Sequence, residues 1–574
     1  MRGTPIMKED VTTLRLPGLS VDTSRSPAEF SFGPGFNAAS AFIDRHLAEG
    51  RGDKVFIRPV SGRTVTFAAL VAGVNRCGNV LRTLGLVAGE RMLMVVKDCP
   101  EFYFLLWGAI KAGIVPVPLN TLLRTGDYRY MIGDSGCAAM VWSAEFSAEV
   151  LPAVQAARPG LRVALPVEDG KETITGSPLP VGEREQAAAL AEIVSPSGGS
   201  NTLASLMAGA SDELDVVPAS AETPCFWLYS SGSTGRPKAV VHRHRDPAVS
   251  SQWYGREVLG IGEDDVTFSA SKLFFAYGFN NSGMVPLWTG SSVVLLDGKP
   301  TPQNTFDVIE KFRPTLYYGI PTLYAAQLQA MESTTPNLSS LRVCVSAGEP
   351  LPPDIFLRWK ARTGHKILDG IGSTEAMHIF ITNRPEDARP GVSGRPVPGF
   401  TVRIVDELGA ELPPGEPGRL QVKGLSTALC YWNNPEKTAA TMQGDWLDTG
   451  DTYSRDAEGF FRYCGRSNDM LKVGGIWCSP IEIESCLASH PDVLEAAVIG
   501  VPDGDGLVKP EAWIVPCDGV RPSESFGDAL MRHCKSTLAP YKFPRKIHFL
   551  DELPKTATGK IQRYRLRRLF EETT

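Results

Sequence analysis

The chain has 574 residues, of which 43% are hydrophobic, 21% charged and 9% aromatic, as in ordinary globular proteins. At about 150 residues per domain, this length is far more than one small core needs. The formal net charge is −6. A nucleic-acid-binding protein usually carries a basic field, so the charge argues against that class.

The sequence contains no feature that predicts export or membrane insertion. The N-terminus has neither an apolar stretch nor a cleavage site of small residues. The longest apolar run, residues 102–110, is shorter than the roughly 20 residues of a membrane span. The 11 cysteines form no CxxC pair and have no zinc-like spacing, which favours reduced thiols. We therefore expect a soluble protein of the cytoplasm.

The first 450 residues alternate helix-like and strand-like segments. Helices are predicted at 38–48 and 100–112, and continuous apolar strands at 91–96, 115–119 and 138–143. Apolar strands between helices indicate a sheet covered on both faces, and so an α/β architecture. Residues 168–222 are rich in Gly, Ser, Pro and Glu, which predicts a surface excursion or a partly ordered loop.

A domain boundary is predicted near residues 465–475. Beyond it the pattern predicts a compact α+β unit of about 100 residues. Its elements are helices at 480–491 and 526–538 and strands at 495–503 and 511–516. We therefore expect a large α/β-layered domain, 1–467, and a small α+β domain, 468–574.

The segment 229–238, YSSGSTGRPK, carries the sharpest chemical signal. Its glycines let the backbone approach a ligand closely, its hydroxyls and N–H groups can solvate phosphate oxygens, and its lysine adds positive charge. It does not fit the Walker A pattern GxxxxGK[ST]. The pattern favours phosphate binding over a plain turn. The candidate residues are Ser230, Ser231, Gly232, Ser233, Thr234, Gly235 and Lys238.

This segment resembles the phosphate loop of the adenylate-forming enzymes, which include the acyl-CoA synthetases. Further family motifs follow in order, and the resemblance spans about residues 30 to 570. It implies that Thr374 contacts the α-phosphate of ATP and that Glu375 holds Mg²⁺. It also implies adenine contacts at Gly348, Glu349, Pro350, Asp369 and Gly370, and ribose contacts at Asp451 and Arg466.

The segment LPKTATGKIQR at 553–563 matches the family's catalytic-lysine motif, which implies that Lys560 is the catalytic lysine. A cation between the carboxylate of the substrate and the α-phosphate offsets their repulsion. The resemblance also implies that the small domain swings at Asn468 between two half-reactions. Gly474 and Gly475 would then line a tunnel for the pantetheine arm of CoA. Relatives mostly have Asp-Asp where this chain has Asn468-Asp469.

Residues 272–281 and 369–380 resemble the benzoate–CoA ligase branch. The branch implies an acid pocket of Ala276, Tyr277, Ile371, Gly372, His378 and Ile379. In relatives that take very short acids a Trp closes the pocket at position 372, and Gly is expected to leave room for a ring. Phe279-Asn280 and Ala376-Met377 depart from the branch's usual pairs, and both departures flank the pocket.

The resemblance therefore implies an ATP-dependent acid–CoA ligase that uses ATP, Mg²⁺ and CoA. An aromatic acid, benzoate or a substituted benzoate, would form an acyl-adenylate and then a thioester, with release of pyrophosphate and AMP. An alicyclic or medium-chain acid–CoA ligase and a carrier-protein-loading enzyme are the alternatives. A non-catalytic regulator is disfavoured because Glu375, Asp451, Arg466 and Lys560 are all present. The expected partners are the three small molecules, with no nucleic acid or membrane; a homodimer is left open.

Overall fold

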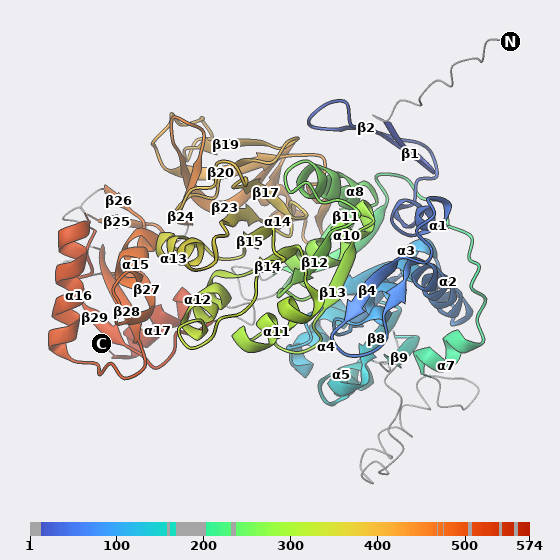
Figure 1. Ribbon diagram of the computed structural model, residues 1–574, viewed down its shortest axis with the longest axis horizontal. Helices are drawn as coiled ribbons and strands as arrows, with labels where there is room; N and C mark the ends of the chain where they lie inside the picture. Colours follow the sequence, from blue (N-terminus) through green and yellow to red (C-terminus); the bar gives the residue numbers. More distant parts are fainter. Residues whose placement is uncertain are drawn as a thin grey trace, which may run out of the picture.

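The computed structural model describes residues 13–157, 161–167, 202–230, 237–467, 469–473, 476–502, 508–538, 542–555 and 561–573. Figure 1 shows the C-terminal unit at one end of the molecule, beyond α12 (Pro321–Ala330) and α13 (Pro353–Thr363), and the first elements of the chain at the other. This arrangement is the predicted one: a large α/β part followed by a small α+β unit.

The largest sheet has nine strands in the order β18-β17-β16-β15-β14-β12-β13-β4-β5. The pairings from β16 through to β4 are parallel, and β17, β18 and β5 are added antiparallel at the two ends. The strands are β4 Val55–Pro59, β5 Val65–Thr66, β12 Val266–Ser269, β13 Ser292–Leu295, β14 Leu316–Gly319, β15 Val343–Ser346, β16 Ile367–Gly372, β17 Ile379–Thr382 and β18 Arg395–Pro396. The inner strands are almost fully buried, as expected for a sheet covered by helices.

A second sheet of four parallel strands has the order β7-β6-β8-β9. Its strands are β6 Arg91–Val95, β7 Val115–Pro118, β8 Ala139–Ser143 and β9 Val163–Val167. The helices next to these strands in the sequence are α2 Phe67–Thr83, α3 Pro100–Lys111, α4 Thr125–Ser135 and α5 Ser147–Ala156. Pro100 opens α3 at a position where a missing N–H costs no helical bond.

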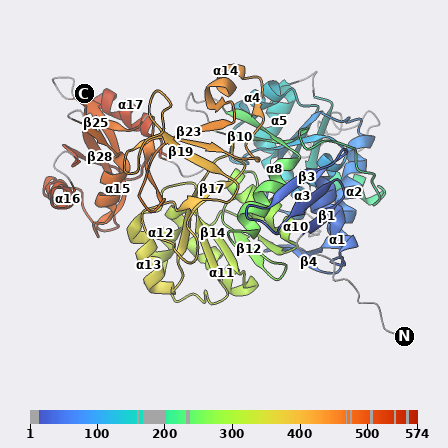
Figure 2. The same ribbon diagram turned by 90° about the horizontal axis from the view of Figure 1, so that it is seen from above.

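Two smaller antiparallel sheets complete the large part. One joins β10 (Pro224–Ser230), β11 (Lys238–Arg243) and β21 (Cys430–Tyr431). The other contains β19 Thr401–Val405, β20 Gly418–Lys423, β22 Met442–Gln443, β23 Trp446–Arg455 and β24 Phe461–Arg466. Figure 2 shows β19 and β23 between the C-terminal unit and the rest of the molecule. The first strands, β1 Thr13–Leu16, β2 Leu19–Asp22 and β3 Glu29–Phe32, form a separate antiparallel sheet.

The C-terminal unit packs helices on a sheet of three strands. Its elements are β25 Leu471–Val473, β26 Ile476–Cys478, α15 Pro480–Ala488, β27 Val493–Pro502, β28 Val508–Pro516, α16 Glu524–Thr537, β29 Ile547–Phe549 and α17 Arg563–Thr573. No helix in the described part of the chain is long and apolar enough to cross a membrane.

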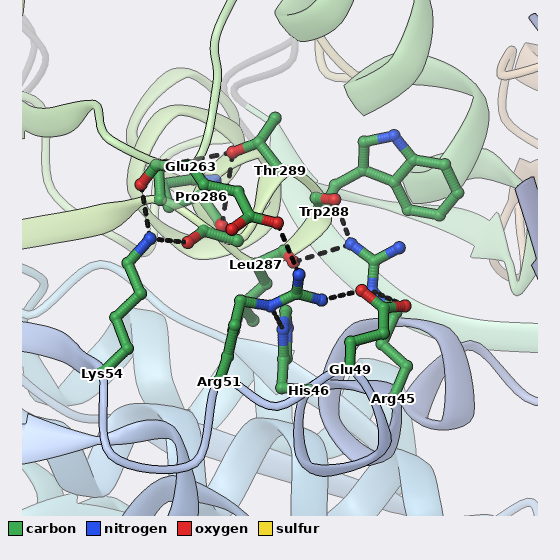
Figure 3. Close-up of polar contacts among 12 residues, drawn as sticks. Arg45, His46, Glu49, Arg51, Lys54, Glu263, Pro286, Leu287, Trp288 and Thr289 are labelled. Carbon is green, nitrogen blue, oxygen red and sulfur yellow. Dashed lines mark hydrogen bonds and ion pairs between the residues drawn. The ribbon is translucent and has the colours of Figure 1, made fainter. Parts of the chain in front are cut away.

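Three helical segments run consecutively from residue 276 to 289: α9 Ala276–Gly278, the π-helical η4 Phe279–Met284 and α10 Val285–Thr289. Cationic side chains from the N-terminal part meet the C-terminal end of this run (Figure 3). Arg45 donates to the carbonyl of Trp288, and Lys54 donates to that of Gly290 at 2.7 Å. Cations are favourable at a helix C-terminus because the last carbonyls lack backbone partners.

The elements predicted in the sequence occur with small differences at their ends. The helix at 38–48 is the π-helical η1 (Ser40–Asp44) followed by α1 (Arg45–Ala48). The segment 168–222 differs in part, because residues 202–222 contain α7 (Leu203–Ala208) and pack on α2 and α3. The amide of Asn75 donates to the carbonyl of Asp212 at 2.7 Å, and the N–H of Val217 donates to that of Lys111 at 2.9 Å.

Candidate active site

Strands β10 and β11 present the two ends of the predicted phosphate loop. Ser230, the last residue of β10, lies opposite Lys238, the first residue of β11. Residues 231–236 between them lie outside the described residues, and with them the candidates Ser231, Gly232, Ser233, Thr234 and Gly235. The antiparallel pairing therefore holds Ser230 and Lys238 side by side at the base of the loop.

Glu375 is the centre of a cluster of polar side chains. Its Oε1 accepts a hydrogen bond of 2.8 Å from the hydroxyl of Tyr431 and one of 3.3 Å from that of Ser230. Nζ of Lys238 lies 3.7 Å from the same oxygen and 4.1 Å from the ring centre of Tyr431. Tyr431 reaches this position because β21 pairs with β11, with Tyr431 opposite Val240. Three residues from three strands thus converge on the carboxylate of Glu375.

The charges of this cluster affect one another. Burial opposes ionisation of Glu375, but Lys238 and the hydroxyl of Tyr431 outweigh it and lower the pKa of Glu375. Burial also lowers the pKa of Lys238, although Glu375 counteracts this effect. No group of three His, Cys, Asp or Glu side chains suited to a metal occurs among the described residues. An ionised, partly exposed Glu375 fits Mg²⁺, which typically takes one or two protein carboxylates together with phosphate oxygens and water.

Asp451 and Arg466, the expected ribose contacts, form an ion pair. Nη1 of Arg466 lies 3.1 Å from Oδ1 of Asp451, and the two residues face each other across β23 and β24. Asp451 is the largest cause of the raised pKa of Arg466. Half of the Arg466 side chain is exposed, whereas Asp451 is buried. The pair therefore offers acceptor oxygens and N–H donors near one another.

The expected adenine contacts lie in two neighbouring parts of the nine-stranded sheet. Gly348, Glu349 and Pro350 follow β15, and Gly348 has a φ of 91°, which favours glycine. Asp369 and Gly370 lie in β16, where Asp369 is paired with Ser346 of β15. Asp369 is buried, and burial raises the pKa of its carboxyl well above the usual range.

The turn at residues 373–378 connects β16 to β17 and carries both Thr374 and His378. Met377 in this turn has a φ of 73°, a left-handed conformation that is uncommon for a residue with a side chain. His242 contacts the turn from β11: its Nε2 lies 2.8 Å from the carbonyl oxygen of Thr374, and its Nδ1 lies 3.0 Å from Oδ2 of Asp246. The N–H of Ala428 donates to the carbonyl of Glu375 at 2.7 Å.

On the other side of this turn lie the aromatic side chains of the expected acid pocket. The ring of His378 stacks on that of Tyr277 at 6.1 Å and meets that of Tyr254 edge-on at 4.9 Å. Burial lowers the pKa of His378 to about 3, so its imidazole is neutral. Ile379 is buried next to it, and Ala276 precedes Tyr277 in α9. The described residues thus form a largely apolar, aromatic wall.

The structure gives its own reason for glycine at position 372. A Cβ built on Gly372 would lie 2.4 Å from the carbonyl oxygen of His378 and 2.9 Å from the N–H nitrogen of Ile379. The side-chain direction therefore points at a backbone and not into open space. The missing side chain at position 372 therefore does not provide room for a ring. Instead, glycine permits the close approach of β16 to the turn. Its neighbour Ile371 packs on the second hydrophobic cluster.

Comparison with protein-family models gives two matches in chain order. Residues 44–432 match the AMP-binding enzyme family, and residues 482–560 match the AMP-binding enzyme C-terminal domain. The chain belongs to the AMP-binding, adenylate-forming enzyme family. Two curated relatives place it in the benzoate–CoA ligase branch of this family. The benzoate–CoA ligase of Thauera aromatica is 45% identical, with 95% of this chain and 98% of the relative covered.

The second relative is the 4-hydroxybenzoate–CoA/benzoate–CoA ligase of Rhodopseudomonas palustris, which is 43% identical over 93% of this chain and 94% of its own length. Solved structures agree. An anthranilate CoA ligase in complex with anthranoyl-AMP superposes with a TM-score of 0.85 at 38% identity, and covers 94% of this chain and 98% of its own. A benzoate CoA ligase from Burkholderia xenovorans LB400 has a TM-score of 0.80 at 39% identity, with 93% and 100% covered.

Several residues that this family resemblance singles out lie outside the described residues: Asn468, Gly474, Gly475 and Lys560. The segment that contains Lys560 is bounded by an isolated bridge between Lys555 and Ile561. After it, α17 is tied to the residue that follows Asn468, because Arg567 lies 2.6 Å from Oδ1 of Asp469. Within the described structure, this ion pair connects the residue after the expected hinge to the helix that follows the lysine segment.

Three functional candidates were missed in the sequence: Tyr431, His242 and Asp246. His242 lies near the end of β11, the strand after the phosphate loop, and Asp246 follows four residues later. This spacing in the sequence could have indicated that the two side chains pair. Tyr431 gave no such signal. It reaches Glu375 through the pairing of β21 with β11, strands that lie far apart in the chain.

Proposed function

We propose that the chain is an ATP-dependent aryl acid–CoA ligase, which converts an aromatic carboxylic acid, benzoate or a substituted benzoate, first into its acyl-adenylate and then into its CoA thioester. One observation carries this proposal. The turn 373–378 has the Glu375–Lys238–Tyr431 cluster on one side and the aromatic wall of Tyr277 and His378 on the other. A carboxylate bound against the wall and a nucleotide bound at the cluster would meet at this turn.

The nucleotide would be held by charges of both signs. Lys238 supplies positive charge at the base of the phosphate loop, and Glu375 would hold Mg²⁺, which neutralises phosphate charge when bound. Thr374, beside Glu375, is assigned to the α-phosphate. Asp451 is assigned to the ribose, because the paired acceptors of a carboxylate suit a vicinal diol. Arg466 steadies Asp451 by their ion pair.

The adenine would lie between the segment that follows β15 and the middle of the neighbouring strand β16. We assign Gly348, Glu349, Pro350, Asp369 and Gly370 to this contact. Parallel strands in an open α/β sheet bind ligands beyond their carboxyl ends, and β15 and β16 are neighbouring parallel strands. Gly370 itself permits the close approach of β16 to β17, since a Cβ there would lie 2.9 Å from the carbonyl oxygen of Ile381.

In the first half-reaction a carboxylate oxygen of the acid attacks the α-phosphorus of ATP, and pyrophosphate leaves. We assign Lys560 to the offset of charge between these two anions. In the second half-reaction the thiol of CoA loses its proton, its sulfur attacks the acyl carbon, and AMP leaves. The intermediate stays bound between the two steps, which protects it from hydrolysis.

The two half-reactions would use two positions of the C-terminal unit. We propose a boundary at residues 467 and 468, a hinge at Asn468, and a path for the pantetheine arm along Gly474 and Gly475. Asp469 follows the hinge and is paired with Arg567 in α17. The hinge-side end of the unit and the helix after the lysine segment would therefore move as one body.

The acid would lie against Ala276, Tyr277, Ile371, Gly372, His378 and Ile379. A neutral His378 between two aromatic rings suits a flat, uncharged ring better than it suits a second charge. We place the reaction in the cytoplasm, because all eleven cysteines are free and eight of them are buried. A homodimer stays a prediction.

The experiment that tests the proposal is AMP formation from ATP and Mg²⁺ with a panel of acids, with and without CoA. The panel contains benzoate, hydroxy- and aminobenzoates, cyclohexanecarboxylate, acetate and a medium-chain fatty acid. We expect CoA-dependent AMP formation with an aryl acid. Turnover of the aliphatic acids alone would contradict the aryl assignment and keep the ligase. Absence of turnover with the whole panel would contradict the proposed function.

A further inference from the structure

The side-chain amide of Asn280 connects two segments of the acid-binding region. Asn280 lies in η4 and is fully buried. Its Nδ2 donates to the carbonyl oxygen of Ala276 at 2.9 Å and to that of Met377 at 2.7 Å. Ala276 is one turn earlier in the same helical run, whereas Met377 is 97 residues away in the turn 373–378. One amide group therefore joins the helix to the turn.

This contact matters because the backbone of Met377 has an unfavourable conformation that its surroundings must hold. A residue with a side chain in the left-handed region costs roughly 1–2 kcal/mol and persists where its surroundings hold it. The turn is held at Thr374 by His242 and at Glu375 by the N–H of Ala428. Both of these contacts come from the nucleotide side. Among the described contacts, the amide of Asn280 is the one that reaches the backbone of Met377 from the acid side.

The two carbonyls that Asn280 binds belong to the residues immediately before Tyr277 and His378. The rings of Tyr277 and His378 stack on each other with centres 6.1 Å apart. Their spacing depends on the distance between the helix and the turn, because each ring follows directly on a backbone carbonyl that the amide holds. A substitution of Asn280 would therefore change the relative position of the two rings against which the acid is expected to lie.

We propose that Asn280 is a positioning residue for acid recognition: its amide fixes the helix that carries Tyr277 against the turn that carries His378. This inference rests on the proposed function, since it assumes that these two rings bind the acid. Asn280 acts through its neighbours and need not touch the substrate. It belongs to the acid side of the site and not to the nucleotide side.

Asn281 offers a matched control within the same helix. It is the same residue type, is equally buried, and neither atom of its amide has a hydrogen-bond partner among the described residues. The substitutions Asn280→Ala and Asn281→Ala therefore remove the same buried group. Only the first removes a contact with the turn. Both proteins are compared with the wild type by thermal unfolding and by steady-state kinetics.

We expect Asn280→Ala to raise the KM of the acid about tenfold, the usual effect of one lost hydrogen bond, and to change the relative kcat/KM values of different acids. The KM of ATP should stay within about twofold, as should all constants of Asn281→Ala, since no contact with the turn is lost. Equal kinetic effects of the two variants would overturn the proposal. So would an Asn280→Ala variant whose KM for ATP rises as much as that for the acid.

A second variant covers the case in which Asn280→Ala does not fold. Asn280→Ser keeps a hydroxyl that can bond to a carbonyl four residues earlier in a helix, but it is too short to reach Met377. The same shift in the KM of the acid is expected, with a smaller loss of thermal stability. Unchanged acid kinetics in Asn280→Ser would overturn the proposal.

These measurements use whichever acid the wild type activates. A wild type that prefers an alicyclic acid would contradict the aryl assignment, yet the comparison of positions 280 and 281 would still decide the inference. Conversely, wild-type turnover of benzoate with equal behaviour of the two variants would leave the proposed function standing and remove the positioning role of Asn280.

Discussion

The hydroxyl of Tyr431 lies 2.8 Å from Oε1 of Glu375, and the ring of the same residue lies 4.1 Å from Nζ of Lys238. One aromatic side chain thus contacts both the negative and the positive group that the nucleotide would meet. The hydroxyl directs the carboxylate, and the face of the ring accommodates the ammonium group. Tyr431 therefore couples the strand after the phosphate loop to the turn that carries Glu375.

The first prediction concerns this coupling. Tyr431→Phe keeps the ring beside Lys238 and removes the hydrogen bond to Glu375. We expect kcat/KM for MgATP to fall roughly tenfold, because a hydrogen bond to a charged group contributes about 1.5–3 kcal/mol. Kinetics at several Mg²⁺ concentrations check this. Tyr128→Phe is the control, since its buried hydroxyl donates to the carbonyl of Asn120, away from the site, at 2.9 Å. Equal effects of both substitutions would contradict the role of Tyr431.

The second prediction concerns His242, which holds the turn from the nucleotide side. Its two ring nitrogens face the carboxylate of Asp246 at 3.0 Å and the carbonyl of Thr374 at 2.8 Å. Glutamine at this position can reach one of these oxygens but not both. We expect His242→Gln to raise the KM of ATP roughly tenfold and to leave that of the acid nearly unchanged. A larger change in the KM of the acid would contradict this assignment.

The third prediction concerns Gly372. A methyl group at this position would press on the carbonyl of His378, at 2.4 Å from its oxygen. We therefore expect Gly372→Ala to displace the turn and to lower kcat/KM for every acid in the panel, with a lower melting temperature. A simple switch of preference toward small acids, with full stability, would show that position 372 opens into the pocket after all.

The sequence predicted the two-part architecture and most of the elements that carry the site. Asp451 and Arg466 are an example, because two motifs predicted them separately as ribose contacts and the structure brings the two side chains within 3.1 Å; their role at the ribose stays a prediction. Tyr431 could not be predicted in this way, since its contact with Glu375 depends on the pairing of two distant strands. The sequence shows that Asn280 and Met377 each depart from the usual residues of the branch. It does not show the 2.7 Å hydrogen bond between them, because this is a tertiary contact.

The fourth prediction concerns acid sensitivity. His46 is fully buried, and burial together with Arg45 and Arg51 lowers its pKa to about 2. In the unfolded chain the ring gains a proton below about pH 6.5 that the folded protein does not bind. His46 therefore costs stability as the pH falls below that value, by roughly 1.4 kcal/mol per pH unit.

Thermal unfolding of the wild type and of His46→Gln at pH 7.5 and pH 5.5 checks this effect. Glutamine does not titrate, so the decrease in melting temperature between the two values should be smaller in the variant, even if the variant is less stable at pH 7.5. An equal decrease in both proteins would contradict a neutral His46. His378, whose pKa is lowered to about 3 by burial, adds to the same trend and is unchanged in this comparison.

In the proposed reaction, the aryl acid is activated by direct attack of its carboxylate on the α-phosphorus of ATP. The most direct test uses benzoate, or the aryl acid of the panel that the enzyme prefers, labelled with ¹⁸O in both carboxyl oxygens, together with ATP, Mg²⁺ and CoA. The oxygen that attacks phosphorus stays with AMP when the thiol displaces it. Direct attack predicts AMP heavier by one ¹⁸O atom and a thioester that keeps the other. Unlabelled AMP, or ADP and phosphate as products, would contradict it.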